Sequence, residues 1–449
     1  MTLVDDLRAA LGHSAVLTGA DIGARHVSDK SETGTTAPLA VVRPRTVEEV
    51  SAALKLCHAA GAPVIAHGGM TGLAGGGNPN GQEIVISLEL LRGIEEIDTA
   101  SATMTVKAGT PLEECQTAAA NAGLFLALDL GSRGSCQIGG NLSTNAGGIR
   151  VIRYGMAREQ VLGLEAVLAD GTIVTSMNKM LKNNAGYDLK HLFIGSEGTL
   201  GIITRAVLRL HPPTGEITTV LCAVSSYDDV VSLLRRAQGE LGGVVAFEAM
   251  WREYFEFNAT ALKLSFFAEP HPFWVILEST EYAETIETFL GACLEDGLLQ
   301  DALIAQSHAQ ARDIWSVREG YPIEKLPNLL NFDVSLPIAQ IGDFAVVCGK
   351  ALHARWPASH NSFYGHVGDS NVHICVSVEY GPGEDMHDVD GIVYGVLKDY
   401  GGSISAEHGI GTLKRPYLHI SRSPAELALM RSLKAALDPK GILNPGKVI

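Results

Sequence analysis

Short apolar runs alternate with amphipathic segments along the first two hundred residues. The apolar residues 39–42 predict a strand. Residues 46–49 have the form of a capping box, and the apolar positions that follow recur with helical spacing until Gly61, so we expect a helix there. Further strand-like runs lie at residues 63–65, 83–88, 103–106, 162–168 and 202–210. This half therefore combines short strands with interposed helices.

The pattern of apolar and polar residues changes after Pro212-Pro213. Residues 220–224 and 273–277 are apolar runs of strand length, and a helix is expected from about residue 228 to residue 241. These elements favour an antiparallel sheet with helices. The whole chain is therefore predicted to be α+β.

The composition limits the class of protein. A chain of 449 residues, 46% hydrophobic and 19% charged, is long enough for two domains with substantial cores. The net charge of −16, with no basic block to offset it, argues against nucleic-acid binding but allows a basic pocket for an anionic substrate. No apolar run approaches the roughly 20 residues of a transmembrane helix, and acids precede any base near the N-terminus. We expect a cytoplasmic protein.

The seven cysteines are scattered and form no Cys-x-x-Cys pair. This spacing excludes an obvious zinc knuckle, a thioredoxin motif and an iron–sulfur cluster. We expect buried, reduced thiols.

Three glycine-rich segments follow strand-like runs or lie beside them, at residues 66–76, 131–148 and 195–204. Clustered glycines let the backbone approach a ligand closely and expose successive N–H groups, which suits an anionic pyrophosphate. Tight turns would explain any one segment. Three segments together favour a binding site.

Two further segments gather histidines and an acid: Gly-His-Val-Gly-Asp-Ser-Asn-Val-His at 365–373 and Ser-Ala-Glu-His-Gly-Ile-Gly at 405–411. Imidazole and carboxylate groups bind borderline divalent metals, and a leftover imidazole titrates near neutral pH. The spacing of His366 and His373 is not that of a one-face helical pair, so these residues are predicted to lie on a strand or turn. Ordinary loop histidines are the alternative.

Together these segments resemble those of vanillyl-alcohol-oxidase-type flavoproteins, with a PCMH-type FAD-binding domain and a flavin-oxidase C-terminal domain. The resemblance runs from about Pro38 to Lys447 and is greatest to FAD-dependent D-2-hydroxyacid dehydrogenases, which act on D-2-hydroxyglutarate or D-lactate. It implies an FAD-binding domain over 1–214 and an antiparallel-sheet substrate (cap) domain with the metal site over 215–415. Residues 416–449 would return to the FAD domain.

The resemblance also implies the residues that bind FAD. Members with covalent FAD attach it through a histidine after the glycine pair of the first segment, where this chain has Met70, so we expect non-covalent FAD. A nicotinamide cofactor is not expected, because no strand, Gly-x-Gly-x-x-Gly, helix and acid occur at the required spacing. The implied FAD contacts are Gly68, Gly69, Thr71, Gly72, Gly75, Ser132, Ser135, Gly139, Gly140, Asn145, Gly148, Ile202 and Asn444.

Oxidation of a 2-hydroxy acid removes a hydride from C2 and a proton from the hydroxyl while the carboxylate is held still. By resemblance, His366, His373 and Glu407 are metal ligands and His408 is the general base. Two imidazoles and one carboxylate leave an open coordination position, and they suit zinc, with manganese or iron as alternatives. Glu407 could instead orient a ligand histidine, and His408 could be structural.

Arg318 is the expected anchor of the substrate carboxylate, because its planar guanidinium matches a carboxylate. An ion pair with Glu319 or another acid is the alternative. Asn371 is a second candidate for substrate binding, although it could simply shape a turn.

The chain departs from the family pattern at two positions. Dehydrogenases of 2-hydroxyglutarate resemble Arg-x-x-x-Thr followed by a lysine, where this chain has Pro322 and Asn331. A lost cation weakens the case for a second substrate carboxylate, because an unpaired buried anion is costly. The substrate could be a monocarboxylate that contacts Asn331, or Arg312 or Lys325 could supply the charge.

The leading hypothesis is a metal- and FAD-dependent dehydrogenase of D-2-hydroxy acids that passes electrons to an electron-transfer flavoprotein or a quinone. A flavin oxidase that uses O₂ is one alternative. A metal-dependent hydrolase is another alternative, but the three glycine-rich segments disfavour it. The sequence leaves open whether the chain forms a homodimer.

Overall fold

The computed structural model describes residues 2–449, which form two compact units. Unit 1 contains the residues up to Gly148, Tyr154–Pro213 and Glu407–Ile449. Unit 2 contains Ile149–Arg153 and Thr214–Ala406. The boundaries differ from the expected division in three places, because residues 407–415 belong to unit 1, and residue 214 and the five residues 149–153 belong to unit 2. Glu407 thus starts a segment of unit 1, although the site was expected in the substrate domain.

The first sheet of unit 1 has strand order β1-β2-β4-β3. Strands β2, β3 and β4 are parallel, and β1 pairs antiparallel with β2. One face packs on Val50, Leu54 and Cys57 of helix α2, the helical face predicted from the sequence. The bounds are β1 (Val16–Leu17), β2 (Ala40–Val42), β3 (Val64–His67), β4 (Ile84–Ser87), α1 (Leu3–Leu11) and α2 (Val47–Ala60).

Helix α2 begins and ends as its sequence predicts, with one difference. The Thr46 side chain accepts a hydrogen bond from Glu49 N–H, and Gly61 ends the helix with a left-handed φ of 63°. The Glu49 carboxylate, however, accepts from Arg45 N–H instead of closing a box on Thr46. The start of the helix was therefore predicted correctly, but the reciprocal bond was not.

The second sheet of unit 1 is antiparallel, with strand order β5-β6-β9-β7-β8, and it shares a hydrophobic core with the first. Its strands are β5 (Ile94–Asp98), β6 (Thr103–Lys107), β7 (Val161–Val167), β8 (Ile173–Ser176) and β9 (Ile202–Arg209). The helices around it and at the C-terminus are α3 (Leu112–Asn121), α4 (Ile138–Ser143), α6 (Lys190–Phe193), α13 (Leu418–Ser421) and α14 (Pro424–Leu437).

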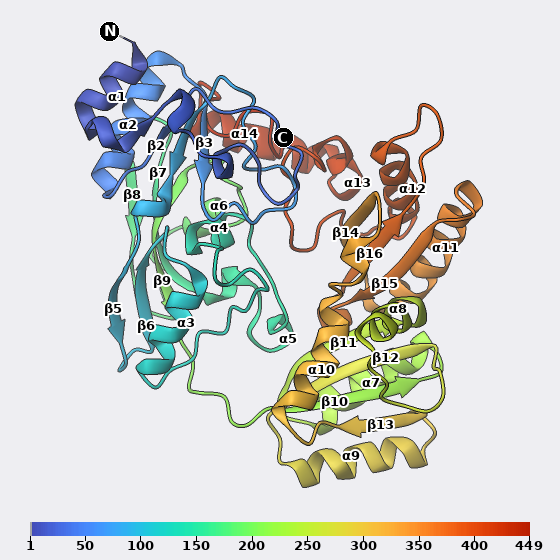
Figure 1. The fold of residues 1–449 in the computed structure, drawn as a ribbon. Coiled ribbons are helices and arrows are strands. Elements are labelled where there is room, and N and C mark those ends of the chain that lie inside the picture. Colours follow the sequence, from blue (N-terminus) through green and yellow to red (C-terminus); the bar gives the residue numbers. More distant parts are fainter. Residues whose placement is uncertain (1) are drawn as a thin grey trace. The chain divides into compact units, whose positions relative to one another are not determined.

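Unit 2 is built on a seven-stranded antiparallel sheet of order β13-β10-β12-β11-β15-β16-β14 (Figure 1). Helices α8 and α10 cover part of one face, where Tyr254, Ile314 and Val317 pack on Leu221 and Ile276. The strands are β10 (Thr218–Val224), β11 (Val244–Trp251), β12 (Phe273–Ser279), β13 (Asp301–Ile304), β14 (Leu329–Ser335), β15 (His360–Gly365) and β16 (Asn371–Ser377). The helices are α5 (Val151–Tyr154), whose last residue belongs to unit 1, α7 (Tyr227–Glu240), α8 (Arg252–Leu262), α9 (Ala283–Glu295), α10 (His308–Glu319), α11 (Ile341–Arg355) and α12 (Met386–Asp399).

The α+β prediction is confirmed, as are the antiparallel sheet after residue 213 and the helix near residue 228. The seven cysteines are buried and form no disulfide within residues 2–449. Among the described helices, none combines the length and apolar character that a membrane span requires.

Candidate metal and flavin sites

The two histidines of the first segment lie at the two ends of a tight connection between β15 and β16. His366 directly follows β15, a 3₁₀ turn covers Val367–Asp369, and His373 is the third residue of β16. The turn is closed because Asn371 N–H donates to the His366 carbonyl at 3.2 Å. The imidazole centroids lie 5.3 Å apart. The expectation that these histidines come from a strand and a turn is confirmed.

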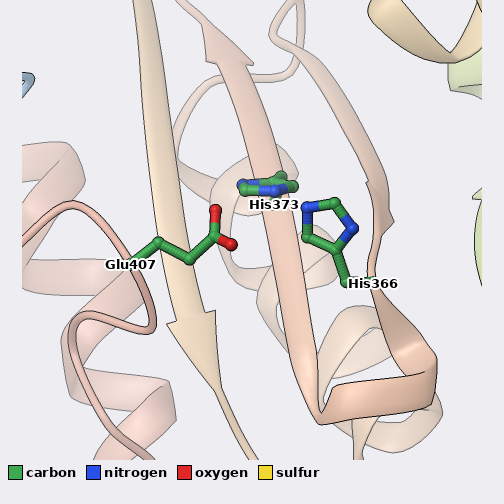
Figure 2. A group of neighbouring side chains, drawn as sticks. All are labelled: His366, His373 and Glu407. Atoms are coloured by element: carbon green, nitrogen blue, oxygen red, sulfur yellow. The ribbon is translucent and has the colours of Figure 1, made fainter. Parts of the chain in front are cut away.

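Glu407 joins the histidines because its chain segment is fixed to β14. Ala406 N–H donates to the carboxylate of Asp333 at 2.8 Å, and Asp333 lies directly across from His373 in the sheet. One ligand atom from each of His366, His373 and Glu407 lies within 4.8 Å of the other two, and the three side chains point toward one another (Figure 2). This donor set of two imidazoles and one carboxylate fits a divalent metal such as zinc.

A buried acid outside the predicted motifs orients His366. Glu248 of β11 accepts a hydrogen bond from His366 Nδ1 at 2.6 Å and pairs with Arg318 Nε at 2.7 Å. Burial opposes ionisation of Glu248, but the neighbouring His366 and Arg318 outweigh it and lower the pKa of the carboxyl. With Nδ1 donating to Glu248, Nε2 of His366 is the nitrogen available to a metal.

Arg318, near the C-terminus of α10, is therefore paired with an acid, but with Glu248 and not with Glu319. The guanidinium carbon also lies 4.6 Å from the centroid of the Tyr364 ring, and Nη2 lies 3.4 Å from His366 Nε2. The predicted anchor is thus adjacent to the histidine cluster. Because Arg318 pairs with Glu248 through Nε, its two terminal nitrogens are the ones that would bind a substrate carboxylate.

The strand register aligns further predicted residues on one face of the sheet. Ser335 pairs with Asn371, Asp333 with His373 and Asn331 with Cys375, so these side chains share a face. Asn371 is 3% exposed, and neither polar atom of its amide has a hydrogen-bond partner among the described residues. A buried amide without partners is suited to receiving a ligand.

Asn331 lies two positions along β14 from Asp333. It is exposed, and its Oδ1 accepts a bond from Cys375 Sγ at 3.1 Å. Pro322 directly precedes the short 3₁₀ turn Ile323–Lys325. Neither residue supplies a positive charge to this face.

Unit 1 brings the three glycine segments together. A Cβ at Gly69 of the first segment would lie 2.1 Å from the Ser135 carbonyl oxygen of the second, so no side chain fits there. Gly195 N–H of the third segment donates to the Leu142 carbonyl at 3.0 Å. Asn444 Nδ2 donates to the Glu197 carbonyl at 2.5 Å, which adds the C-terminal segment to the cluster.

Unsatisfied polar atoms mark this cluster as a fit for FAD. Oε1 of Gln137 and Oδ1 of Asn444 are buried and have no hydrogen-bond partner among residues 2–449. Gln137 Oε1 would lie 3.8 Å from a Cβ at Gly68, and the Asn444 amide lies beside Gly198, so both side chains border the glycine segments. The predicted contacts in these segments include Gly68, Gly69, Thr71, Gly72, Gly75, Ser132, Ser135, Gly139, Gly140, Asn145, Gly148 and Asn444, and Ile202 opens β9 within the third segment.

His408 is half-buried and follows Glu407 in a loop that the glycine segments hold. Ile410 N–H and Gly411 N–H donate to the two carboxylate oxygens of Glu197 at 2.7 and 2.8 Å. Burial raises the pKa of Glu197 although these two donors act against it. Neither Glu197 nor Glu248 was predicted from the sequence, where the only signals were an acid within a glycine-rich segment and an acid within an apolar strand.

Comparison with known families agrees with the flavin site. Residues 215–448 match the C-terminal domain of FAD linked oxidases, and residues 38–176 match an FAD binding domain. The chain is 40% identical over 424 residues to a D-2-hydroxyglutarate dehydrogenase of Xanthomonas citri pv. viticola, covering 92% of this chain and 89% of that protein. The chain belongs to the FAD-linked oxidase family.

A second relative and a solved structure are also similar to this chain. The mitochondrial D-2-hydroxyglutarate dehydrogenase of Bos taurus is 38% identical, with 91% of this chain and 76% of that protein covered. The solved structure of p-cresol methylhydroxylase with substrate bound superposes with a TM-score of 0.76 at 16% identity, covering 99% of this chain and 96% of the other. The PCMH-type flavoprotein fold is confirmed, and this chain is an FAD-linked oxidoreductase.

Proposed function

We propose that this FAD-linked oxidoreductase is a metal-dependent dehydrogenase that converts a D-2-hydroxy acid to the 2-oxo acid. The observation that carries the proposal is the group of His366, His373 and Glu407 within a chain that has FAD-binding segments. The D-2-hydroxyglutarate dehydrogenases among its relatives support the substrate class.

Each group at the two sites has a separate role in the proposed reaction. FAD, held non-covalently by the glycine segments, supplies a hydride acceptor for C2. A divalent metal, proposed to be zinc held by His366, His373 and Glu407, supplies a Lewis acid that makes a hydroxyl proton easier to remove. His408 accepts that proton as general base, and Asn371 offers its unpaired amide to the substrate. The proposed electron acceptor is an electron-transfer flavoprotein or a quinone.

Arg318 binds the substrate carboxylate through its terminal nitrogens while Glu248 fixes its orientation. The charges near this anchor favour one carboxylate over two. Arg318 and Glu248 cancel each other, and Asn331 is neutral. A second substrate carboxylate on this face would need a cation from another residue. We therefore propose that D-2-hydroxy monocarboxylates such as D-lactate are better substrates than D-2-hydroxyglutarate.

The test is anaerobic bleaching of the flavin with a panel of D- and L-2-hydroxy acids, before and after EDTA treatment. The proposal predicts bleaching by D-acids only, loss of bleaching when EDTA removes the metal, and recovery when Zn²⁺ is added. Bleaching that persists after verified metal removal would contradict the role of the histidine cluster. Absence of bleaching by every acid would contradict the substrate class. Comparison of turnover with O₂ and with an artificial acceptor separates a dehydrogenase from an oxidase.

A further inference from the structure

The third glycine segment contains a glutamate whose conformation is unusual. Glu197 lies between Ser196 and Gly198 and has a left-handed φ of 51°, which is uncommon for a residue with a side chain. Its N–H donates to the Ser143 carbonyl at 2.8 Å, and its own carbonyl accepts from Asn444. Both ends of the residue are therefore fixed to segments that are expected to bind FAD.

The carboxylate of Glu197 contacts the loop that follows Glu407 and His408. Ile410 N–H donates to Oε1 and Gly411 N–H to Oε2, at 2.7 and 2.8 Å. Hydrogen bonds to a carboxylate are among the stronger ones in proteins. One side chain thus satisfies two consecutive N–H groups of the loop.

Close packing adds to this contact. A Cβ at Gly409 would lie 2.9 Å from the carboxylate of Glu197. Gly409 also has a φ of 81°, which a residue with a side chain rarely adopts. The loop therefore rests directly on Glu197 with no room for a larger residue.

The other glycine segments hold the loop as well. Gly148 N–H of the second segment donates to Oε1 of Glu407 at 2.6 Å. The Ala74 carbonyl of the first segment accepts from Thr412 N–H and Leu413 N–H at 3.0 and 3.2 Å. Glu407 and His408 thus lie on a loop that all three segments of unit 1 support.

We propose that Glu197 is a positioning residue that presents Glu407 to the metal and His408 to the substrate. It acts through the backbone of residues 409–411. The inference rests on the proposed function in that Glu407 is taken as a metal ligand.

Glu197→Gln tests the proposal, because glutamine offers one acceptor oxygen and turns a donor toward the other N–H group. Zn²⁺ affinity is measured by chelator competition on EDTA-treated protein that retains FAD, and flavin bleaching is followed with the best D-acid of the panel. We expect a roughly 10–100-fold weaker Zn²⁺ affinity and a lower kcat with little change in KM, while the flavin spectrum is unchanged. Glu165→Gln is the control, because Glu165 is also buried in unit 1 but pairs with Thr204 and Arg205.

A second variant leaves Glu197 intact. Gly409→Ala places a methyl group against its carboxylate, and Gly441→Ala controls for backbone strain because Gly441 has a φ of 65° and open space around it. We expect weaker Zn²⁺ affinity in Gly409→Ala only.

The outcomes separate the two proposals. Wild-type protein that binds no Zn²⁺ would contradict the metal site itself. Wild-type binding with unchanged affinity and kcat in both Glu197→Gln and Gly409→Ala would overturn the positioning role alone. Loss of FAD together with metal in Glu197→Gln would also overturn it, because the residue would then support the flavin cluster as a whole.

Discussion

Glu248 and His366 form a 2.6 Å hydrogen bond between a carboxylate oxygen and Nδ1, and both side chains are buried. The bond fixes which ring nitrogen of His366 faces the other two members of the cluster. Since Glu248 also pairs with Arg318, one carboxylate orients the proposed ligand and the proposed substrate anchor together.

Glu248→Gln is expected to weaken Zn²⁺ binding by roughly 10–100-fold, because the imidazole loses its charged partner. Breaking the buried pair with Arg318 should also lower the free energy of unfolding, by about 3–5 kcal/mol. Zn²⁺ affinity by chelator competition and urea unfolding measure the two effects. Glu278→Gln breaks a similar buried pair with Arg150 and should reduce stability without reducing Zn²⁺ affinity. Equal Zn²⁺ affinities in the two variants would argue against an orienting role for Glu248.

His408→Ala should leave FAD and metal bound but slow flavin reduction by about 10²–10⁴-fold, the usual contribution of a general base. Stopped-flow bleaching measures the rate, and the visible spectrum and metal content check that both groups are retained. His419→Ala is the control, because His419 is exposed in the same part of unit 1 and its Nδ1 bonds the Pro416 carbonyl at 3.0 Å. Rapid bleaching in His408→Ala would refute the base assignment.

Asn331→Lys should shift substrate preference toward D-2-hydroxyglutarate. The lysine would add a cation to the sheet face that carries His373 and Asn371, and a second carboxylate would then have a partner. The ratio of kcat/KM for D-2-hydroxyglutarate to that for D-lactate measures the shift, which we expect to be about tenfold. Asn331→Met controls for side-chain length without charge. An equal ratio in the lysine and methionine variants would show that the charge at residue 331 does not set specificity.

Acid should destabilise the FAD-binding unit through His67. This histidine donates from Nε2 to the Gly77 carbonyl at 2.7 Å and stacks on His26. Burial lowers its pKa from 6.5 to about 3, with the neighbouring His26 acting in the same direction. Between these pH values the unfolded chain binds more protons than the folded one. The contribution of His67 to the free energy of unfolding is therefore complete above pH 6.5 and is lost as the pH falls toward 3.

Urea unfolding between pH 7 and pH 4 should show this loss with a slope of up to about 1.4 kcal/mol per pH unit. His67→Asn should flatten the dependence, whereas the exposed His13→Asn should leave it unchanged. The same slope in all three proteins would assign the acid sensitivity to other groups.

The sequence by itself determined the local features of this protein. Helix α2 begins at Thr46 and ends at Gly61 because a hydroxyl cap and a left-handed glycine act within a few residues of each other. The strands, the glycine segments and the turn between His366 and His373 were predictable for the same reason, since each depends on nearby residues. The resemblance to a flavoprotein family then supplied the expected ligands and contacts.

Only the tertiary structure decided how these parts meet. Glu248 lies 70 positions before Arg318, and Glu197 lies 213 positions before Ile410, so no local pattern joins them. Strand order and register bring β11 beside β15, and hydrogen bonds to the Glu197 carboxylate join the third glycine segment to the loop after His408. Such pairs depend on which strands hydrogen-bond and on how the chain crosses between units. For this reason the partner of Arg318 and the support of Glu407 appeared only in the folded chain.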